Sequence, residues 1–321
     1  EMKKLLFIAG AILVIILFPI LNKNMYHLYL MNRALIHAIL ATGLVFLTGF
    51  AGQISLGQAG FYAIGAYSSA YFTVKLGMPI PVGIIIGIAI SVLAGFLLSI
   101  PSFKLKAFFL SLVTIAFGQI VWMLVINLTP ITGGPYGFFG IPFYSVGNNM
   151  LSFGQVFWLF GALLILCVYI MFRIKHSHFG RAMLAMNDDD VATESCGIST
   201  KRLKIAAFGF AAGLAGLAGA LYAHLAGFLS PEPFTFFESS NFVAMAVVGG
   251  LRHMSGGVVG GIGLTLLPEF LRFGGWENYY LMVTSLIVIV VIIFMPMGLG
   301  PIIENLFRKI FRLKRSNTKT L

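Results

Sequence analysis

The sequence predicts an all-α, polytopic transmembrane bundle of about eight spans plus a broken or re-entrant hairpin, with a short helix outside the membrane. Three observations predict this class. Of the 321 residues, 59% are hydrophobic and only 10% are charged, and the mean hydropathy is +0.97, as is typical of multi-span membrane proteins. Apolar stretches long enough to cross a bilayer recur along the chain. One polar, charged island at residues 180–204 interrupts them.

The expected spans follow from the need for about twenty apolar residues per crossing of a ~30 Å hydrocarbon core. Two shorter apolar pieces, 240–251 and 257–272, are separated by the polar run from Arg252 to Gly256 and predict the broken hairpin. The full-length spans are expected near residues 5–21, 28–50, 53–74, 79–100, 107–128, 153–172, 205–228 and 278–296.

Basic residues beside these spans indicate the orientation, because Lys and Arg accumulate on the cytoplasmic side of a membrane. With the N-terminus inside, most basic residues fall on that side, and the external loop at 129–152 carries no charge. Residues 1–321 are therefore expected to form one membrane domain with cytoplasmic termini, a cytoplasmic loop at 180–204 and a basic cytoplasmic tail at 305–321. The net charge of +11 belongs to these flanks and predicts contact with lipid, not with nucleic acid.

The chain lacks the usual devices for driving transport by itself. No Asp or Glu lies between Met2 and Asn187, whereas ion-driven carriers generally keep a carboxylate inside the bundle. No phosphate-binding P-loop motif is present either, and Cys167 and Cys196 have no metal-ligand spacing. A transporter of this kind is expected to depend on a partner. A secondary carrier or channel is the alternative, and a membrane enzyme is disfavoured because no catalytic cluster is evident.

The polar island contains, in order, the signals of a short helix outside the membrane. Asn187 is a suitable N-cap, and the aspartates 188–190 would fill the first turn, where carboxylates meet the positive end of the helix. The helix would continue past Glu194 and stop at Gly197. These signals favour a docking helix over a solvated connecting loop, which remains the alternative.

Two glycine-rich stretches, 49–60 and 247–261, lie at membrane depth in the two halves of the chain. Irregular backbone at that depth is tolerated where it lies against protein or lines a cavity, and broken segments in both halves are a pointer to a transport path. The alternative is that the glycines only allow close helix packing, and both interpretations remain open. The candidate path residues are Ser55, Gly57, Gln58, Gly249 and Gly250.

Other polar residues within the spans have simpler interpretations. His37 and His224 are candidates for solute contacts or gating, but hydrogen bonding between helices is the favoured role. Glu269 and Arg272 are three residues apart, so they are expected to neutralise each other as an i,i+3 pair and not to form a proton site.

Several blocks in this sequence resemble the LivM-type permeases of branched-chain amino-acid ABC importers. The first is GFAGQISLGQAGFYAIGAYSSA at 49–70, and the second is TGGPYGFFGIP at 132–142. The third begins with the island and continues through AAGLAGLAGALYA at 211–223, SPEPF at 230–234 and VVGGLRHMSGGVVGG at 247–261. Together these blocks cover most of the chain in the order of the family.

The resemblance implies a permease that alternates its access across a bacterial cell membrane while ATP is used by partner subunits, with no cofactor in this chain. It implies a second, LivH-type permease, two ATPase subunits and an extracytoplasmic solute-binding protein as partners. The Arg252-His253 pair and the acidic run depart from the family pattern, and the exact solute is left open. The coupling element implied for the ATPase contact comprises Gly180, Arg181, Asn187, Asp188, Asp189, Asp190, Glu194 and Gly197.

Overall fold

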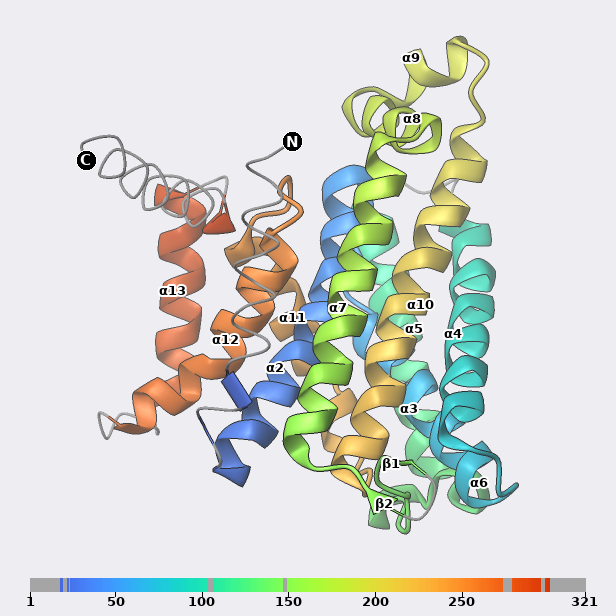
Figure 1. The fold of residues 1–321 in the computed structure, drawn as a ribbon. Helices are drawn as coiled ribbons and strands as arrows, with labels where there is room; N and C mark the ends of the chain where they lie inside the picture. The colour runs from blue at the N-terminus through green and yellow to red at the C-terminus, as the bar shows by residue number, and fades with distance from the viewer. Residues whose placement is uncertain are drawn as a thin grey trace, which may run out of the picture.

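The computed structural model describes residues 18–19, 22, 24–102, 107–146, 149–273, 279–295 and 298–300. The predicted all-helical class is confirmed, with the helices packed side by side in a bundle (Figure 1). The expected span at 5–21 lies almost wholly outside the described residues, and the expected tail at 305–321 lies outside them entirely. The helices are α2 (Met25–Leu44), α3 (Gln58–Val74), α4 (Ile80–Ser102), α5 (Ala107–Asn127), α6 (Thr129–Thr132), α7 (Phe153–His176), α8 (His178–Asp188), α9 (Asp190–Ser195), α10 (Thr200–Ala226), α11 (Phe236–Gly249), α12 (Gly256–Phe273) and α13 (Tyr280–Phe294).

Five helices in the described part of the chain are long and apolar enough to cross a membrane. Each falls on a span expected from the sequence, although the helices beside the polar island extend beyond the apolar residues. Two shorter apolar helices, Phe236–Gly249 and Met282–Val291, add to them. The five long segments are Met25–Phe50, Ile80–Ile100, Phe109–Asn127, Phe153–His176 and Thr200–Ala226.

Both interruptions expected from the glycine-rich stretches are present. After α2 the chain forms a π-helix, η1 (Val45–Phe50), and then runs without regular structure until α3 begins at Gln58. The expected span at 53–74 is therefore only partly helical, because Gly52 turns the backbone into a positive φ of 67° that few other residues tolerate. In the second half α11 ends at Gly249 and α12 begins at Gly256, as the broken hairpin predicts.

Close helix packing holds the bundle together. Helix α10 contacts α3 and α4, and α12 contacts α2. A Cβ added at Gly65 of α3 would lie 2.1 Å from the Gly216 carbonyl oxygen of α10, and one at Gly261 of α12 would lie 2.6 Å from the Ala38 Cα of α2. The backbones thus approach too closely for any side chain, which is how small residues favour helix association in membranes.

The polar connections gather at opposite ends of the bundle (Figure 1). Helices α8 and α9 lie at one end, beyond α7 and α10, while α6, β1 (Ser145–Val146) and β2 (Asn149–Met150) lie at the other. The two strands pair antiparallel, with Ser145 opposite Met150. The 3₁₀ turn η2 (Gly134–Tyr136) follows α6, and η3 (Glu232–Phe234) precedes α11.

Candidate coupling and translocation site

The polar island begins with a tight corner between α7 and α8. Ser177 caps α8, and its hydroxyl oxygen accepts a hydrogen bond from the Gly180 N–H at 3.2 Å. A Cβ at Gly180 would lie 2.2 Å from the Ile174 carbonyl oxygen, so only glycine fits the corner. Arg181 donates to the His176 carbonyl oxygen at 3.0 Å and lies 2.9 Å from His178 Nδ1. Gly180 and Arg181 therefore fix the direction in which α8 leaves the membrane helix.

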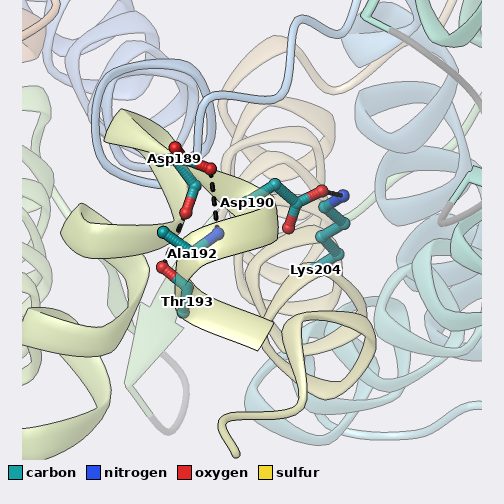
Figure 2. A network of polar contacts seen from close by, with 5 residues as sticks. All are labelled: Asp189, Asp190, Ala192, Thr193 and Lys204. Carbon is teal, nitrogen blue, oxygen red and sulfur yellow. Dashed lines mark hydrogen bonds and ion pairs between the residues drawn. The ribbon is translucent and has the colours of Figure 1, made fainter. Parts of the chain in front are cut away.

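The expectation that Asn187 caps the island helix is wrong. Asn187 lies in the last turn of α8, and the N-cap of the following helix α9 is Asp189, whose Oδ1 accepts from the Ala192 N–H at 2.9 Å (Figure 2). Only Asp190 of the three aspartates lies in the first turn of α9. The reason is that α8, with Met183 and Met186 buried, continues through Asp188. The expected stop is confirmed, since Gly197 follows α9 with φ +79°.

Helix α9 is tied to the start of α10 by one ion pair. The Lys204 ammonium contacts the Asp190 carboxylate (Figure 2). Asp188 and Glu194 are exposed, as is Val191, whose side chain is 76% exposed. The island is thus a folded, partly apolar projection supported from both α7 and α10.

Asn187 joins this projection to the first glycine-rich stretch. Its Nδ2 donates to the Gly49 carbonyl oxygen at 3.1 Å, a contact between residues 138 positions apart. A Cβ at Gly52 would lie 2.3 Å from Asn187 Oδ1, so the side chain fits tightly over the break between α2 and α3. The Asn187 side chain therefore connects α8 directly to the backbone of that break.

Side chains from two other helices, α5 and α11, and from Ser55 within the break accept hydrogen bonds from the freed backbone N–H groups. The Leu56 N–H donates to Thr114 Oγ1 at 3.0 Å and the Ala59 N–H donates to Ser239 Oγ at 2.9 Å. Ser55 is fully buried and accepts weakly from the Gly57 N–H at 3.5 Å. Sequence reasoning missed Thr114 and Ser239, because nothing near them in the chain indicates that α5 and α11 meet this segment.

Gln58 is the unusual member of the candidate path residues. Its side chain is 1% exposed, and within the described residues neither Oε1 nor Nε2 has a hydrogen-bond partner. Most buried polar groups in proteins are paired. An unpaired amide at the start of a half-helix inside the bundle therefore calls for an explanation beyond packing.

The two glycine-rich stretches lie directly against each other. A Cβ at Gly49 would lie 1.7 Å from the Leu251 carbonyl oxygen of the second stretch. Within the second stretch, a Cβ at Gly249 would lie 1.8 Å from the Gly256 carbonyl oxygen. Gly250 adopts a φ of +110°. These contacts confirm the close-packing role of the glycines, while a solute path along them stays a prediction.

The two histidines within the spans and the Glu269–Arg272 pair have structural partners. His37 Nδ1 lies 2.9 Å from Thr265 Oγ1, and His224 bridges Ser69 and the Pro142 carbonyl oxygen, each at 2.9 Å. These bonds between helices confirm the favoured role of both histidines. Glu269 and Arg272 pair at 3.9 Å, as expected. Over the described ranges, no group of three or more His, Cys, Asp or Glu side chains is arranged to hold a metal ion.

Comparison with known proteins agrees with this arrangement. The family model for the permease component of branched-chain amino acid transport systems matches residues 26–293. The chain is 34% identical to the high-affinity branched-chain amino acid transport system permease protein LivM of Escherichia coli K12, over 83% of this chain and 68% of that protein. It is 33% identical to LivM of Salmonella typhimurium, over 84% and 69% of the two chains.

A more distant relative is the ribose import permease protein RbsC of Haemophilus influenzae, 25% identical over 92% of this chain and 93% of that protein. No solved structure matches the chain. The family match spans all the described spanning helices and both glycine-rich stretches. The chain therefore belongs to the family of branched-chain amino acid ABC transport permeases, as a multi-pass membrane subunit that transports its solute and is not an enzyme.

Proposed function

We propose that this chain imports leucine, isoleucine, valine or closely related amino acids together with a LivH-type second permease. Two ATPase subunits would bind the α8–α9 end of the bundle, and an extracytoplasmic binding protein would deliver solute at the opposite end. The family match and the LivM relatives support this assignment. The similarity to a ribose permease means that the shared fold alone does not choose the solute.

Coupling would begin at the projection formed by α8 and α9. When the ATPases close on ATP, they displace this projection, and α7 and α10 tilt with it because Arg181 and the Asp190–Lys204 pair hold the corners. Coupling elements need rigid, two-state contacts to transmit a displacement. The α8–α9 projection is held by polar contacts on both sides, through Arg181 at the α7 corner and through Lys204 of α10.

The translocation path would run beside the two glycine-rich stretches, facing the second permease. Ser55, Gln58 and the freed backbone of the breaks would replace water around a solute that crosses the membrane. Alternating access follows if the break between α2 and α3 opens to one side at a time. The observation that carries the proposal is the Asn187–Gly49 hydrogen bond, because it links the ATPase side to this break.

The experiment that tests the proposal removes this link. Asn187→Ala in the reconstituted complex is expected to preserve ATP hydrolysis stimulated by the binding protein but to lower amino-acid uptake about tenfold, as expected when a coupling contact worth 1–2 kcal/mol is lost. Ser195→Ala is the matched control, since Ser195 also lies in the projection but bonds only within α9. If Asn187→Ala transports at the control rate for each ATP hydrolysed, the proposed link is wrong.

Two further variants test the corners of the projection. Gly197→Pro would replace a φ of +79° by one fixed near −65°, and Arg181→Glu would remove the donor to His176. Both are expected to separate ATP hydrolysis from transport while membrane insertion is unchanged. Wild-type transport in either variant would count against a docking role for α8–α9.

A further inference from the structure

In the part of the chain that the structure describes, two charged side chains of the bundle have no ionic partner. Along the described helices α2, α3, α4, α5, α11, α12 and α13, the charged residues are Arg33, Glu238, Glu269 and Arg272. Glu269 and Arg272 pair with each other. Within the described residues, Arg33 and Glu238 form no ion pair within 4.0 Å, although unpaired charges at membrane depth are costly and usually functional.

The packing of α2 against α11 brings Arg33 and Glu238 to the same level. His37 of α2 contacts Phe242 of α11, with ring centroids 5.5 Å apart. Beyond the ends of α2 and α11, Gly49 of η1 lies against Leu251, so the chain runs in the same direction through the two contacts. Arg33 precedes His37 by four residues and Glu238 precedes Phe242 by four. At a rise of 1.5 Å per residue, Arg33 lies about 6 Å along the axis from His37, and Glu238 lies about 6 Å in the same direction from Phe242.

Aromatic side chains complete the surroundings of these charges. Tyr62 of α3 packs against Phe242 and Tyr222, with ring centroids 5.6 Å apart in both pairs. Arg33, Glu238 and Tyr222 are half-buried, whereas Tyr62 is buried. The group therefore lies at the edge of the packed core.

The guanidinium of Arg33 has a free hydrogen-bond donor among the described residues. Its Nε is buried and has no hydrogen-bond partner in the described part of the chain, and an unsatisfied buried donor is costly. Among the described residues, the Glu238 carboxylate accepts only a long bond of 3.5 Å from Asn241 of its own helix. An arginine binds a carboxylate through two parallel hydrogen bonds, and an ammonium is attracted both to a carboxylate and to tyrosine faces.

We infer that Arg33 and Glu238 form the two poles of a site for the zwitterionic backbone of an amino acid. Arg33 binds the carboxylate, Glu238 binds the ammonium, and the half-buried Tyr222 contacts the aliphatic side chain, while the buried Tyr62 packs against Tyr222. The inference rests on the proposed import function and names the residues that receive the solute inside this subunit. It adds a charged site to the neutral path residues Ser55 and Gln58. The two sets are joined by the hydrogen bond from the Ala59 N–H to Ser239 Oγ, because Ala59 follows Gln58 and Ser239 follows Glu238 in the chain.

The test measures solute binding to the permease–ATPase complex in nanodiscs without the binding protein, by saturation-transfer NMR. The ligands are L-leucine, L-leucinamide, which lacks the carboxylate, and 4-methylpentanoate, which lacks the ammonium. The wild-type complex is expected to bind leucine about tenfold more tightly than either analogue, the value of one charged hydrogen-bonded contact. Arg33→Gln should abolish the preference over leucinamide, and Glu238→Gln should abolish the preference over 4-methylpentanoate.

Arg272→Gln is the matched control, because it removes an arginine of α12 whose side chain is 60% exposed, and it should keep both preferences. Arg33→Lys keeps the positive charge but cannot form two parallel hydrogen bonds to a carboxylate, so this variant should bind leucine with intermediate affinity. It provides the test if the Arg33→Gln complex does not assemble. Retention of both preferences in the two glutamine variants, or no leucine binding by the wild type, would overturn the site. ATP-dependent uptake by the wild-type complex tests the import function separately.

Discussion

Gln58 is the residue whose surroundings depart furthest from those of an ordinary core position. Its amide is buried without a hydrogen-bond partner among the described residues, so the folded state bears a cost of about 1–3 kcal/mol for each such group. The amide would recover this cost if a solute that passes through the path formed hydrogen bonds with it. A leucine at this position fills a similar volume without the polar atoms.

Gln58→Leu is therefore expected to keep or raise the thermal stability of the purified complex while it lowers amino-acid uptake. The double variant with Ser55→Leu should lower uptake further, with complex assembly and solute capture by the binding protein unchanged. Melting temperature and initial uptake rate are the two measurements. Stability and uptake that fall together would assign Gln58 to packing, and unaltered uptake would place the path elsewhere.

At the scale of single elements, the projection depends on one carboxylate more than on its neighbours. Asp189 caps α9 through the Ala192 N–H, whereas Asp188 is exposed at the end of α8. Loss of a helix N-cap costs about 1 kcal/mol. Asp189→Ala should therefore unfold α9 more often, with hydrogen exchange of its amides about fivefold faster.

Asp188→Ala is the matched control for this change, because it removes a neighbouring carboxylate that caps nothing in the described structure. It should leave exchange in α9 at the wild-type rate. Equal protection of α9 in both variants would show that the Asp189 cap does not stabilise the helix.

The island illustrates which elements are predictable from sequence and which are not. Its position, the presence of a helix and the stop at Gly197 follow from local signals, since caps and glycine stops act within a few residues. The exact cap does not, because the burial of Met183 and Met186 against the bundle extends α8 by tertiary contact. The bond from Asn187 to Gly49 spans 138 positions, and no local pattern indicates it.

The same limit applies to the breaks in the membrane helices. Glycine density predicts both interruptions, because glycine weakens a helix and permits positive φ. The partners that satisfy the freed N–H groups, Thr114 and Ser239, come from distant helices. The sequence likewise does not indicate that Arg33 and Glu238 lie at the same level, because this follows from the packing of α2 against α11.

For the molecule as a whole, the proposed orientation places the α8–α9 end in the cytoplasm. Cys196 is exposed at that end and Cys167 is buried, so the native chain carries a suitable reporter thiol. Tyr136 at the opposite end is 83% exposed, whereas Thr132 in the same loop is only 5% exposed and would label poorly. In cells without the ATPases, an impermeant maleimide should label Tyr136→Cys from outside and Cys196 only after permeabilisation. External labelling of Cys196 would reverse the topology.

This membrane subunit is expected to accumulate no solute without its partner subunits, and reconstitution measures that dependence. Proteoliposomes that contain both permeases, the ATPases and the binding protein are compared with proteoliposomes that contain the permeases alone under proton or sodium gradients. We expect leucine to accumulate against its gradient only in the complete system and only with ATP. Accumulation by the permeases alone under an ion gradient would contradict the account and identify a secondary carrier.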